Sequence, residues 1–264
     1  MQHQEKAPEG NLGKLTEFVL LDFADVPHLQ RFLFGLFLLT YIIILMGNGI
    51  TFLMTKLDLV SRPPCFFSLA IFPFWKSATC LLTLPRMLTS LWTQRMTSLV
   101  ACATQMCFIF ILGATEWFLL AVMAYDHYVA ICNPLHYPLV MNYKVCIQLV
   151  AGSWISGIPI QIGQTSQIFS LPFCGSNLIN HFFCDIPPIL KLACGDTFLN
   201  GMLVFTVAAL FVLVPFLLIL VSYGKIISTI LTLPSATSWG KTFSTCFSHL
   251  MVVALFFGSA IVTY

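Results

Sequence analysis

The residues of this chain that could do chemistry are the ionisable side chains within its apolar stretches. Lys76 interrupts the apolar stretch at 66–88, and Glu116 interrupts the stretch at 99–124, which Asp126 and His127 follow almost directly. A charge inside a bilayer costs about 2.5–3.5 kcal/mol on insertion scales, so such residues are usually paired or functional. Each of them therefore needs a partner, a route to water or a role.

Lys76 and Glu116 are predicted to lie at the same depth in the membrane. Lys76 is ten residues after the start of its stretch, and Glu116 is ten residues before Asp126 on an antiparallel helix. At about 1.5 Å per residue, both side chains start roughly 15 Å from the same face. We therefore expect a buried Lys76–Glu116 ion pair. The alternative is that the Lys76 side chain bends toward water and pairs with nothing.

Catalytic motifs are not found in the sequence. It has no Gly-rich phosphate loop, serine triad or metal-binding histidine pair, so we expect neither an enzyme nor a cofactor or metal ion. The histidines after the first span are far apart in the sequence and on different predicted elements: His127, His136, His181 and His249. A metal site of His181 with nearby cysteines is the alternative, but the usual Cys-x-x-Cys ligand spacing is missing.

The composition is that of an integral membrane protein. Hydrophobic residues make up 58% of the 264 and charged residues only 8%, with a mean hydropathy of +0.92. In soluble domains about a quarter of the residues are charged. A net charge of +2 without a clustered basic stripe argues against a nucleic-acid partner. The expected surroundings of this chain are a lipid bilayer.

Six apolar stretches long enough to cross a bilayer predict an all-α integral membrane bundle. Residues 1–30, which are polar and mixed in charge, are predicted to form an extracellular amino-terminal arm, and residues 31–264 the transmembrane bundle. The predicted spans cover residues 32–54, 66–88, 99–124, 145–165, 198–223 and 242–264. A polar loop at 233–241 is predicted to precede the sixth span. Lys and Arg near the span ends number five in the odd loops and three in the even loops, which favours cytosolic odd loops.

Three motifs lie at the ends of these spans. Residues 123–137 read MAYDHYVAICNPLHY, residues 241–250 read KTFSTCFSHL, and the loop before the fifth span contains LPFC at 171–174 and INHFFCD at 179–185. These motifs closely resemble those of vertebrate olfactory receptors, a branch of the rhodopsin-like G-protein-coupled receptors. The resemblance implies a rhodopsin-like bundle of seven helices. We find six of them, and the sequence ends at Tyr264 before a seventh.

Four cysteines are predicted to lie on one side of the membrane: Cys102, Cys174, Cys184 and Cys194. In a protein made through an oxidising compartment they predict two disulfides, for which the sequence alone allows three pairings. The resemblance implies that Cys102 pairs with Cys184, joining the third span to the loop, and that Cys174 pairs with Cys194 in a local ring. Together with the charge count, these cysteines favour a multi-pass plasma-membrane protein with its amino terminus outside.

The resemblance also implies a small volatile ligand, bound toward the outer half of spans three, five and six. The residues expected to line an apolar cavity there are Phe110, Gly113, Ala114, Phe205, Phe257 and Tyr264. Gly113 and Ala114 would provide volume, and the Tyr264 hydroxyl could bond a ligand oxygen. The alternative is that these residues are ordinary interhelical packing.

Asp126, His127 and Tyr128 are expected to face a heterotrimeric G protein of the stimulatory class. The family has Arg at the position of His127, and its guanidinium is planar and permanently charged. His127 is shorter and, with an unperturbed pKa of about 6.5, mostly neutral at cytosolic pH. We therefore expect weak coupling.

Two other functions stay open at this point. A truncated, degenerate receptor relative would insert without signalling or be retained in the endoplasmic reticulum. The reversed charge at Lys76, where the family has an acid, and the replacement of Arg by His127 favour it. A small membrane transporter would use Lys76 and Glu116 as a coupling pair. Internal repeats, which would favour transport, are not found.

Overall fold

The computed structural model describes residues 17–20, 27–57, 96–174, 178–179, 184–232 and 236–263. Most of these residues are helical. The helices are α1 (Pro27–Leu57), α3 (Leu99–Cys132), α4 (Tyr137–Val140), α5 (Tyr143–Phe169), α6 (Ile186–Leu192), α7 (Phe198–Thr232) and α8 (Ala236–Thr263). The strands are β1 (Glu17–Leu20), β2 (Met96–Ser98) and β3 (Leu178–Ile179).

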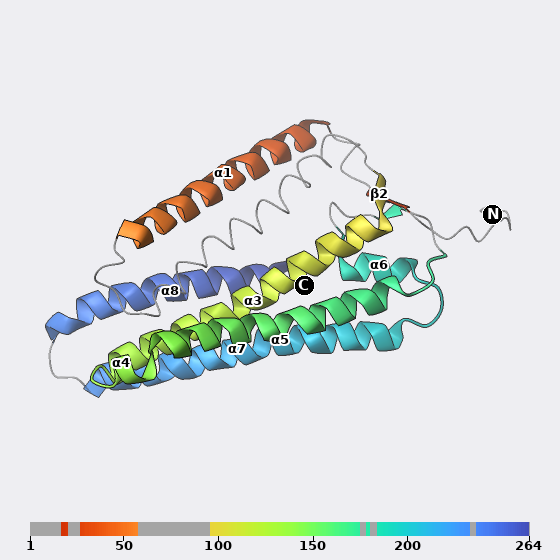
Figure 1. Cartoon of the computed structure of the whole chain (residues 1–264). Helices are drawn as coiled ribbons and strands as arrows, with labels where there is room; N and C mark the ends of the chain where they lie inside the picture. The colour runs from red at the N-terminus through yellow and green to blue at the C-terminus, as the bar shows by residue number, and fades with distance from the viewer. Residues whose placement is uncertain are drawn as a thin grey trace, which may run out of the picture.

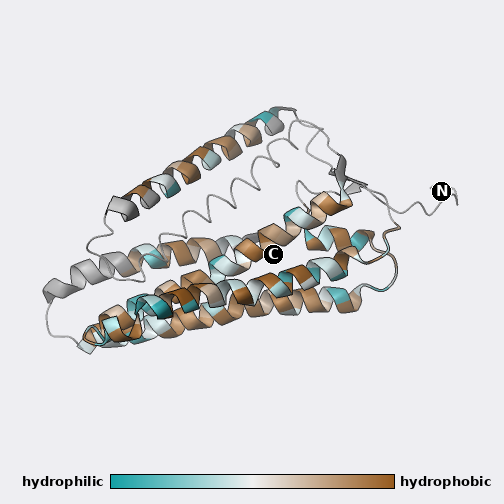
Figure 2. Ribbon diagram, viewed as in Figure 1, coloured by the Kyte–Doolittle hydropathy of each residue, from teal (hydrophilic) through white to brown (hydrophobic). Residues whose placement is uncertain are grey.

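Several helices are long and apolar enough to cross a membrane, which confirms the predicted all-helical membrane fold. The four segments of sufficient length and hydropathy among the described residues are Arg31–Ile50, Leu99–Cys132, Tyr143–Phe169 and Phe198–Thr232. A shorter apolar segment, Cys246–Ser259, lies within α8. Figure 2 shows hydrophobic residues along the lengths of α1 and α7. The predicted span at 66–88 lies outside the described residues, so six spans stay a prediction.

α3 is longer than the span predicted at 99–124. It begins after Ser98, whose side chain accepts a hydrogen bond of 3.2 Å from the amide of Ala101, the usual arrangement at a helix start. It ends at Cys132, and Pro134 follows two residues later. Because proline disfavours helical backbone at the residue before it, Pro134 stops the helix there. Asp126, His127 and Tyr128 therefore lie in the last turns of α3.

Two predicted boundaries differ from the structure. α8 begins at Ala236, so residues 236–241, predicted as part of the polar loop at 233–241, are helical. No proline occurs between Ala236 and Lys241, and an amphipathic or polar turn can extend a helix beyond the apolar segment. The predicted arm at 1–30 contains β1 and the first turn of α1, which opens on Pro27, a residue favoured at the first helical position.

α3 is the central helix of the bundle. It packs against α5, α7 and α8, and Figure 1 shows these four helices running side by side. The largest buried cluster joins α3, α7 and α8 and comprises Leu120, Ala121, Ala124, Ile219, Tyr223, Ile226, Cys246, Val253 and Phe257. On the α5 side, a Cβ built on Gly157 would lie 3.4 Å from the Cβ of Ala114. Small residues at these contacts let the helix backbones approach closely.

A small sheet lies where α3 begins. β1 is its central strand: Glu17 pairs with Ser98 in the antiparallel strand β2, and Val19 pairs with Leu178 in the parallel strand β3. α4 lies at the opposite end of the bundle (Figure 1). The amino-terminal segment is thus bonded to the residues that lead into α3 and to the loop before α6.

Candidate ligand and coupling sites

One end of α3, which we call the disulfide end, is tied by one disulfide, and a second disulfide closes a local ring in the segment between α5 and α7. Cys102 of α3 is bonded to Cys184 with a Cα–Cα distance of 5.6 Å, and Cys174 to Cys194 with a distance of 5.5 Å. Both are the pairings that the resemblance implies. Cys102 and Cys184 are buried in a cluster with Met106, Ile168, Ile186 and Ile189. The disulfide end is therefore both covalently closed and packed.

The six predicted ligand residues do not share one cluster. Phe110 packs against the cluster at the disulfide end, whereas Phe257 is buried in the cluster of α3, α7 and α8. Ala114 is buried against Gly157 of α5. Phe205 is 70% exposed on α7. Tyr264 lies outside the described residues.

The space next to Gly113 is open. A Cβ built on Gly113 would meet no atom of the described residues within 4 Å, and the residue is half-buried. Of the two small residues predicted to provide volume, Gly113 has room beside it, whereas Ala114 makes a helix–helix contact.

An aromatic cluster around Phe257 was missed in the sequence. The Trp117 ring of α3 lies 4.3 Å from the Phe257 ring and 4.7 Å from the Phe256 ring, both edge to face. Phe216 of α7 lies 5.0 Å from Phe257. Aromatic pairs at these distances add about 0.5–1.5 kcal/mol beyond their burial. The signal that could have revealed the cluster is Trp117 next to Glu116 in the middle of an apolar stretch.

Several polar side chains of α3 and α5 are buried. Glu116 is 8% exposed, and α5 contributes Gln161, Gln164 and Thr165, all buried. Among the described residues the amide nitrogen of Gln164, Nε2, has no hydrogen-bond partner. Buried polar groups are usually bonded, so this donor is available to a ligand oxygen. Lys76, the predicted partner of Glu116, lies outside the described residues.

The other end of α3, which we call the triplet end, contains Asp126, His127 and Tyr128. Asp126 is buried and accepts a hydrogen bond of 2.7 Å from the hydroxyl of Tyr137 in α4. Burial, helped by the bond to Asp126, raises the pKa of Tyr137 above its usual range, so the hydroxyl keeps its proton at neutral pH. Tyr128 is half-buried and packs against Val129 and its neighbours. Asp126 thus joins the end of α3 to the short helix that follows it.

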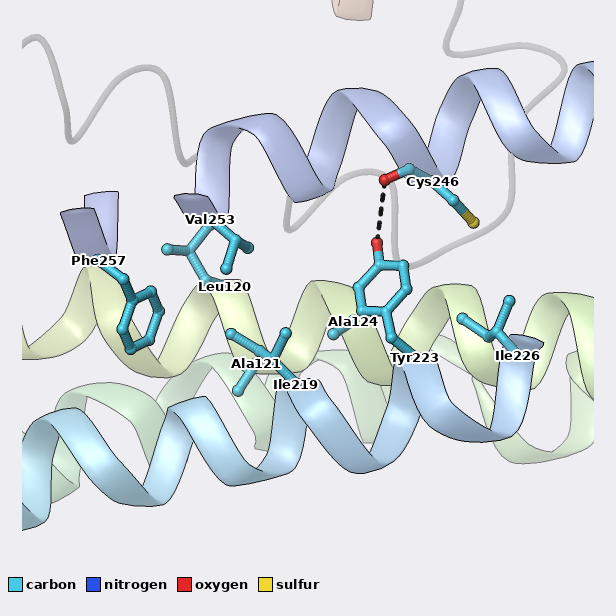
Figure 3. Packing of buried hydrophobic residues seen from close by; sticks show 9 residues of the cluster. All are labelled: Leu120, Ala121, Ala124, Ile219, Tyr223, Ile226, Cys246, Val253 and Phe257. Carbon is cyan, nitrogen blue, oxygen red and sulfur yellow. Dashed lines mark hydrogen bonds between the residues drawn. The ribbon is translucent and has the colours of Figure 1, made fainter. Parts of the chain in front are cut away.

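His127 lies against another histidine. Its ring centroid is 5.4 Å from that of His249 in α8, with the two ring planes at 78°. The Nδ1 atom of His249 in turn lies 2.8 Å from the hydroxyl oxygen of Tyr223 in α7. That hydroxyl also donates to the carbonyl oxygen of Cys246 at 3.4 Å, as Figure 3 shows. Side chains from three helices therefore meet at the triplet end.

Groups of three or more His, Cys, Asp or Glu placed to hold a metal ion are not found in the described part of the chain. The residues that the structure brings together at the triplet end are an acid, two imidazoles and three phenols. Those at the disulfide end are cystines and apolar side chains. Neither set of described residues includes a nucleophile beside a general base in the manner of a catalytic triad.

The comparisons with known proteins agree over nearly the whole chain. A family model described as "Olfactory receptor" matches residues 37–264. Human olfactory receptor 10AG1 is 59% identical over 249 residues, which cover 94% of this chain and 83% of that protein. Human olfactory receptor 10A7 is 47% identical over 255 residues, covering 96% of this chain and 81% of that protein. Human olfactory receptor 10C1 is 44% identical over 255 residues, which cover 96% of this chain and 82% of that protein.

Proposed function

Because this chain belongs to the olfactory receptor family, we propose that it detects small volatile odorants and activates a stimulatory G protein. As a member of that family it is a multi-pass receptor of the plasma membrane that responds to odorants through a G protein, and it is not an enzyme. The observation that carries the function is the 59% identity to a human olfactory receptor over 94% of the chain.

The ligand binds beside the aromatic cluster where α3, α7 and α8 meet. The rings of Trp117, Phe216 and Phe257 offer an apolar wall, and the open space at Gly113 offers volume. Of the predicted lining residues, Phe205 is left out because it is exposed, and Ala114 because it packs on α5.

Paired phenylalanine variants test this ligand position. Cells expressing the chain are exposed to a panel of odorants, and cyclic AMP is measured at equal surface expression. Phe257→Leu is expected to shift the half-maximal concentration of an active odorant at least ten-fold, since it removes a ring from the wall. Phe205→Leu, at an exposed site on α7, is the matched control and should leave it unchanged. Equal responses in both variants would place the ligand elsewhere.

Coupling is through the triplet end, with Asp126, His127 and Tyr128 facing the G protein. His127 supplies neither the length nor the permanent charge of the family's Arg, so coupling is weak. His127→Arg should raise the maximal cyclic AMP response at saturating odorant several-fold without moving the half-maximal concentration. A variant that signals no better than the natural chain would contradict this assignment.

A receptor that binds odorant but does not signal is the second candidate. The observation favouring it is that His127 lies against the buried His249. Direct binding of an odorant to the purified chain, measured without any G protein, separates the two functions. Binding without a cyclic AMP response in either the natural chain or His127→Arg would favour the non-signalling receptor.

Glu116 is proposed to pair with Lys76 inside the bundle. Its burial on α3 supports a charged partner, because an unpaired buried charge costs about 3–5 kcal/mol when one half of a pair is removed. Such a pair would hold the core in one conformation. Lys76→Glu is expected to change basal and odorant-driven cyclic AMP, and unchanged signalling would end the proposal.

A further inference from the structure

We propose that His127 and His249 form a binding site for a divalent transition-metal ion that joins α3 to α8 at the triplet end. The two residues are 122 positions apart in the sequence, and neither has been given this role above. The inference goes beyond odorant detection and does not depend on it.

The spacing of the two rings fits an ion between them. Zinc binds imidazole nitrogen at about 2.0–2.1 Å, and tetrahedral bond angles then place two imidazole centroids about 5 Å apart. The His127 and His249 centroids are 5.4 Å apart, and their planes cross at 78°. The separation of the two rings is therefore compatible with an ion bound by one nitrogen of each.

The hydrogen bonds around His249 are compatible with the tautomer in which Nε2 carries no proton. The Tyr223 hydroxyl has a single proton, which it donates to the carbonyl oxygen of Cys246. In the tautomer that metal binding requires, Nδ1 of His249 donates its proton to that hydroxyl across the contact of 2.8 Å. Neutral imidazole has one N–H, so Nε2 presents a lone pair. Histidine ligands of metals are held in this way, by a second hydrogen bond that fixes ring and tautomer.

The Nε2 atom of His249 lacks a hydrogen-bond partner although it is buried. His249 is 5% exposed, and Nε2 completes no bond within the described residues, while the Leu120 backbone interacts with the ring. A buried acceptor without a donor is uncommon and costs free energy. A metal ion between the imidazoles would satisfy it. His127 is half-buried, which leaves a path for the ion and for water ligands from the triplet end.

The chemistry of the site selects the metal. Imidazole nitrogens suit zinc, copper(II) and nickel(II), whereas magnesium and calcium prefer oxygen. Two imidazoles are a small ligand set, and the remaining positions are taken by water, so binding is weaker than at a structural zinc site. Asp126, which precedes His127 in the sequence and accepts a hydrogen bond from Tyr137, supplies a negative charge next to the positive charge of the ion. An ion here fixes α3 to α8 and should lower activation through the triplet end.

Thermal unfolding of the purified full chain in lipid nanodiscs, with and without zinc chloride, tests the site. A ligand that binds only the folded state raises the Tm. We expect a rise of a few degrees for the natural chain, and none for His127→Ala or His249→Ala. His136→Ala is the matched control, because His136 is an exposed histidine before α4, and its rise should equal that of the natural chain. No rise in the natural chain, or the same rise in His127→Ala, overturns the proposal.

Two further variants keep the test decisive if His249→Ala does not fold. Tyr223→Phe removes the hydroxyl that holds Nδ1 and should weaken zinc binding by about ten-fold or more. His127→Arg removes an imidazole but keeps a long polar side chain and should abolish binding. Cobalt(II) added to the natural chain should give visible absorption bands that disappear in His127→Arg. Persistence of the bands in His127→Arg would show that cobalt binds elsewhere and overturn the site.

Discussion

The two ends of α3 are held by different kinds of bonds. At the disulfide end, Cys102 is covalently joined to Cys184, and the segment that follows Cys174 is closed by Cys194. At the triplet end, the polar contacts among the described residues are hydrogen bonds and ring contacts: Asp126 with Tyr137, and His249 with Tyr223 and His127. α3 itself is thus covalently joined at the disulfide end, whereas its described contacts at the triplet end are noncovalent.

The difference suits a receptor that transmits a signal along α3. A ligand can shift an equilibrium only between states that the protein can reach, so at least one end must be able to rearrange. The disulfide end anchors α3 against the loop before α6. The triplet end, whose contacts each contribute about 1 kcal/mol or a little more, is where a second arrangement costs least.

Removing either disulfide should cause the largest losses in the free energy of unfolding. These variants distinguish the disulfide end from the triplet end most clearly. The Cys102–Cys184 bond spans 82 residues and the Cys174–Cys194 bond 20. Chain entropy predicts that they contribute about 4.5 and about 3.3 kcal/mol respectively to the free energy of unfolding. The double variants Cys102→Ser/Cys184→Ser and Cys174→Ser/Cys194→Ser are compared with the natural chain by denaturant unfolding in detergent. Cys132→Ser, at a free cysteine of the triplet end, is the control.

A small loss of stability on removing the Cys102–Cys184 disulfide would contradict the difference proposed between the two ends of α3. If Cys102→Ser/Cys184→Ser loses no more than Cys132→Ser, packing alone holds the disulfide end, and the two ends do not differ in kind. A loss of the expected size together with retained odorant binding would instead show that the anchor serves stability alone.

The contrast between the ends was only partly predictable from the sequence. Long apolar runs fix helices, and the cysteine motifs indicate disulfides through the resemblance, so the anchored end was foreseen. The pairing of His127 with His249 was not, because nothing in local spacing links residues on α3 and α8. Phe205 failed for another reason: α7 is apolar on every side, so its sequence does not tell which face is buried. β1 is four residues long and pairs with distant strands, which gives no local signal.

Replacing Gly157 by a larger residue should cause the next largest loss of unfolding free energy. It tests the helix packing midway along α3 separately from the bonds at its two ends. A Cβ there already lies 3.4 Å from Ala114, so Gly157→Leu must push α5 away from α3 midway between the two ends. Overpacking of this kind costs about 2–3 kcal/mol. Gly152→Leu on the same helix, where a Cβ meets no atom in the described part of the chain within 4 Å, is the matched control for helix propensity. Equal stability of the two variants in thermal unfolding would show that α3 and α5 are not in close contact.

Removing the Tyr137 hydroxyl should cost less and acts on the triplet end alone. Tyr137→Phe leaves the buried Asp126 without its donor, and a hydrogen bond to a charged group contributes about 1.5 kcal/mol. The pKa of Tyr137 is raised in the folded chain. The stability that depends on its proton is therefore fully present below the ordinary, unfolded-state tyrosine pKa of about 10, and it is lost only as the pH rises above that value toward the folded-state pKa. The difference in unfolding free energy between the natural chain and Tyr137→Phe should therefore not change between about pH 7 and 9 through Tyr137. Tyr143→Phe, at an exposed tyrosine, is the control, and an equal loss there would contradict a specific bond.

The contact between Cys132 and Thr229 should give the smallest effect. The Cys132 sulfur lies 3.2 Å from the Thr229 hydroxyl and links the end of α3 to α7. A thiol is a weak hydrogen-bonding group, so Thr229→Val should cost no more than about 0.5 kcal/mol beyond Thr206→Val, whose hydroxyl bonds only its own helix. Unfolding of the two variants in detergent measures that difference. A cysteine sulfur of α3 makes a contact at each end of the helix. If Thr229→Val lowered the free energy of unfolding nearly as much as loss of the Cys102–Cys184 disulfide, the triplet end would be as firmly fixed as the disulfide end. The signal would then have to pass by a movement of α3 as a whole.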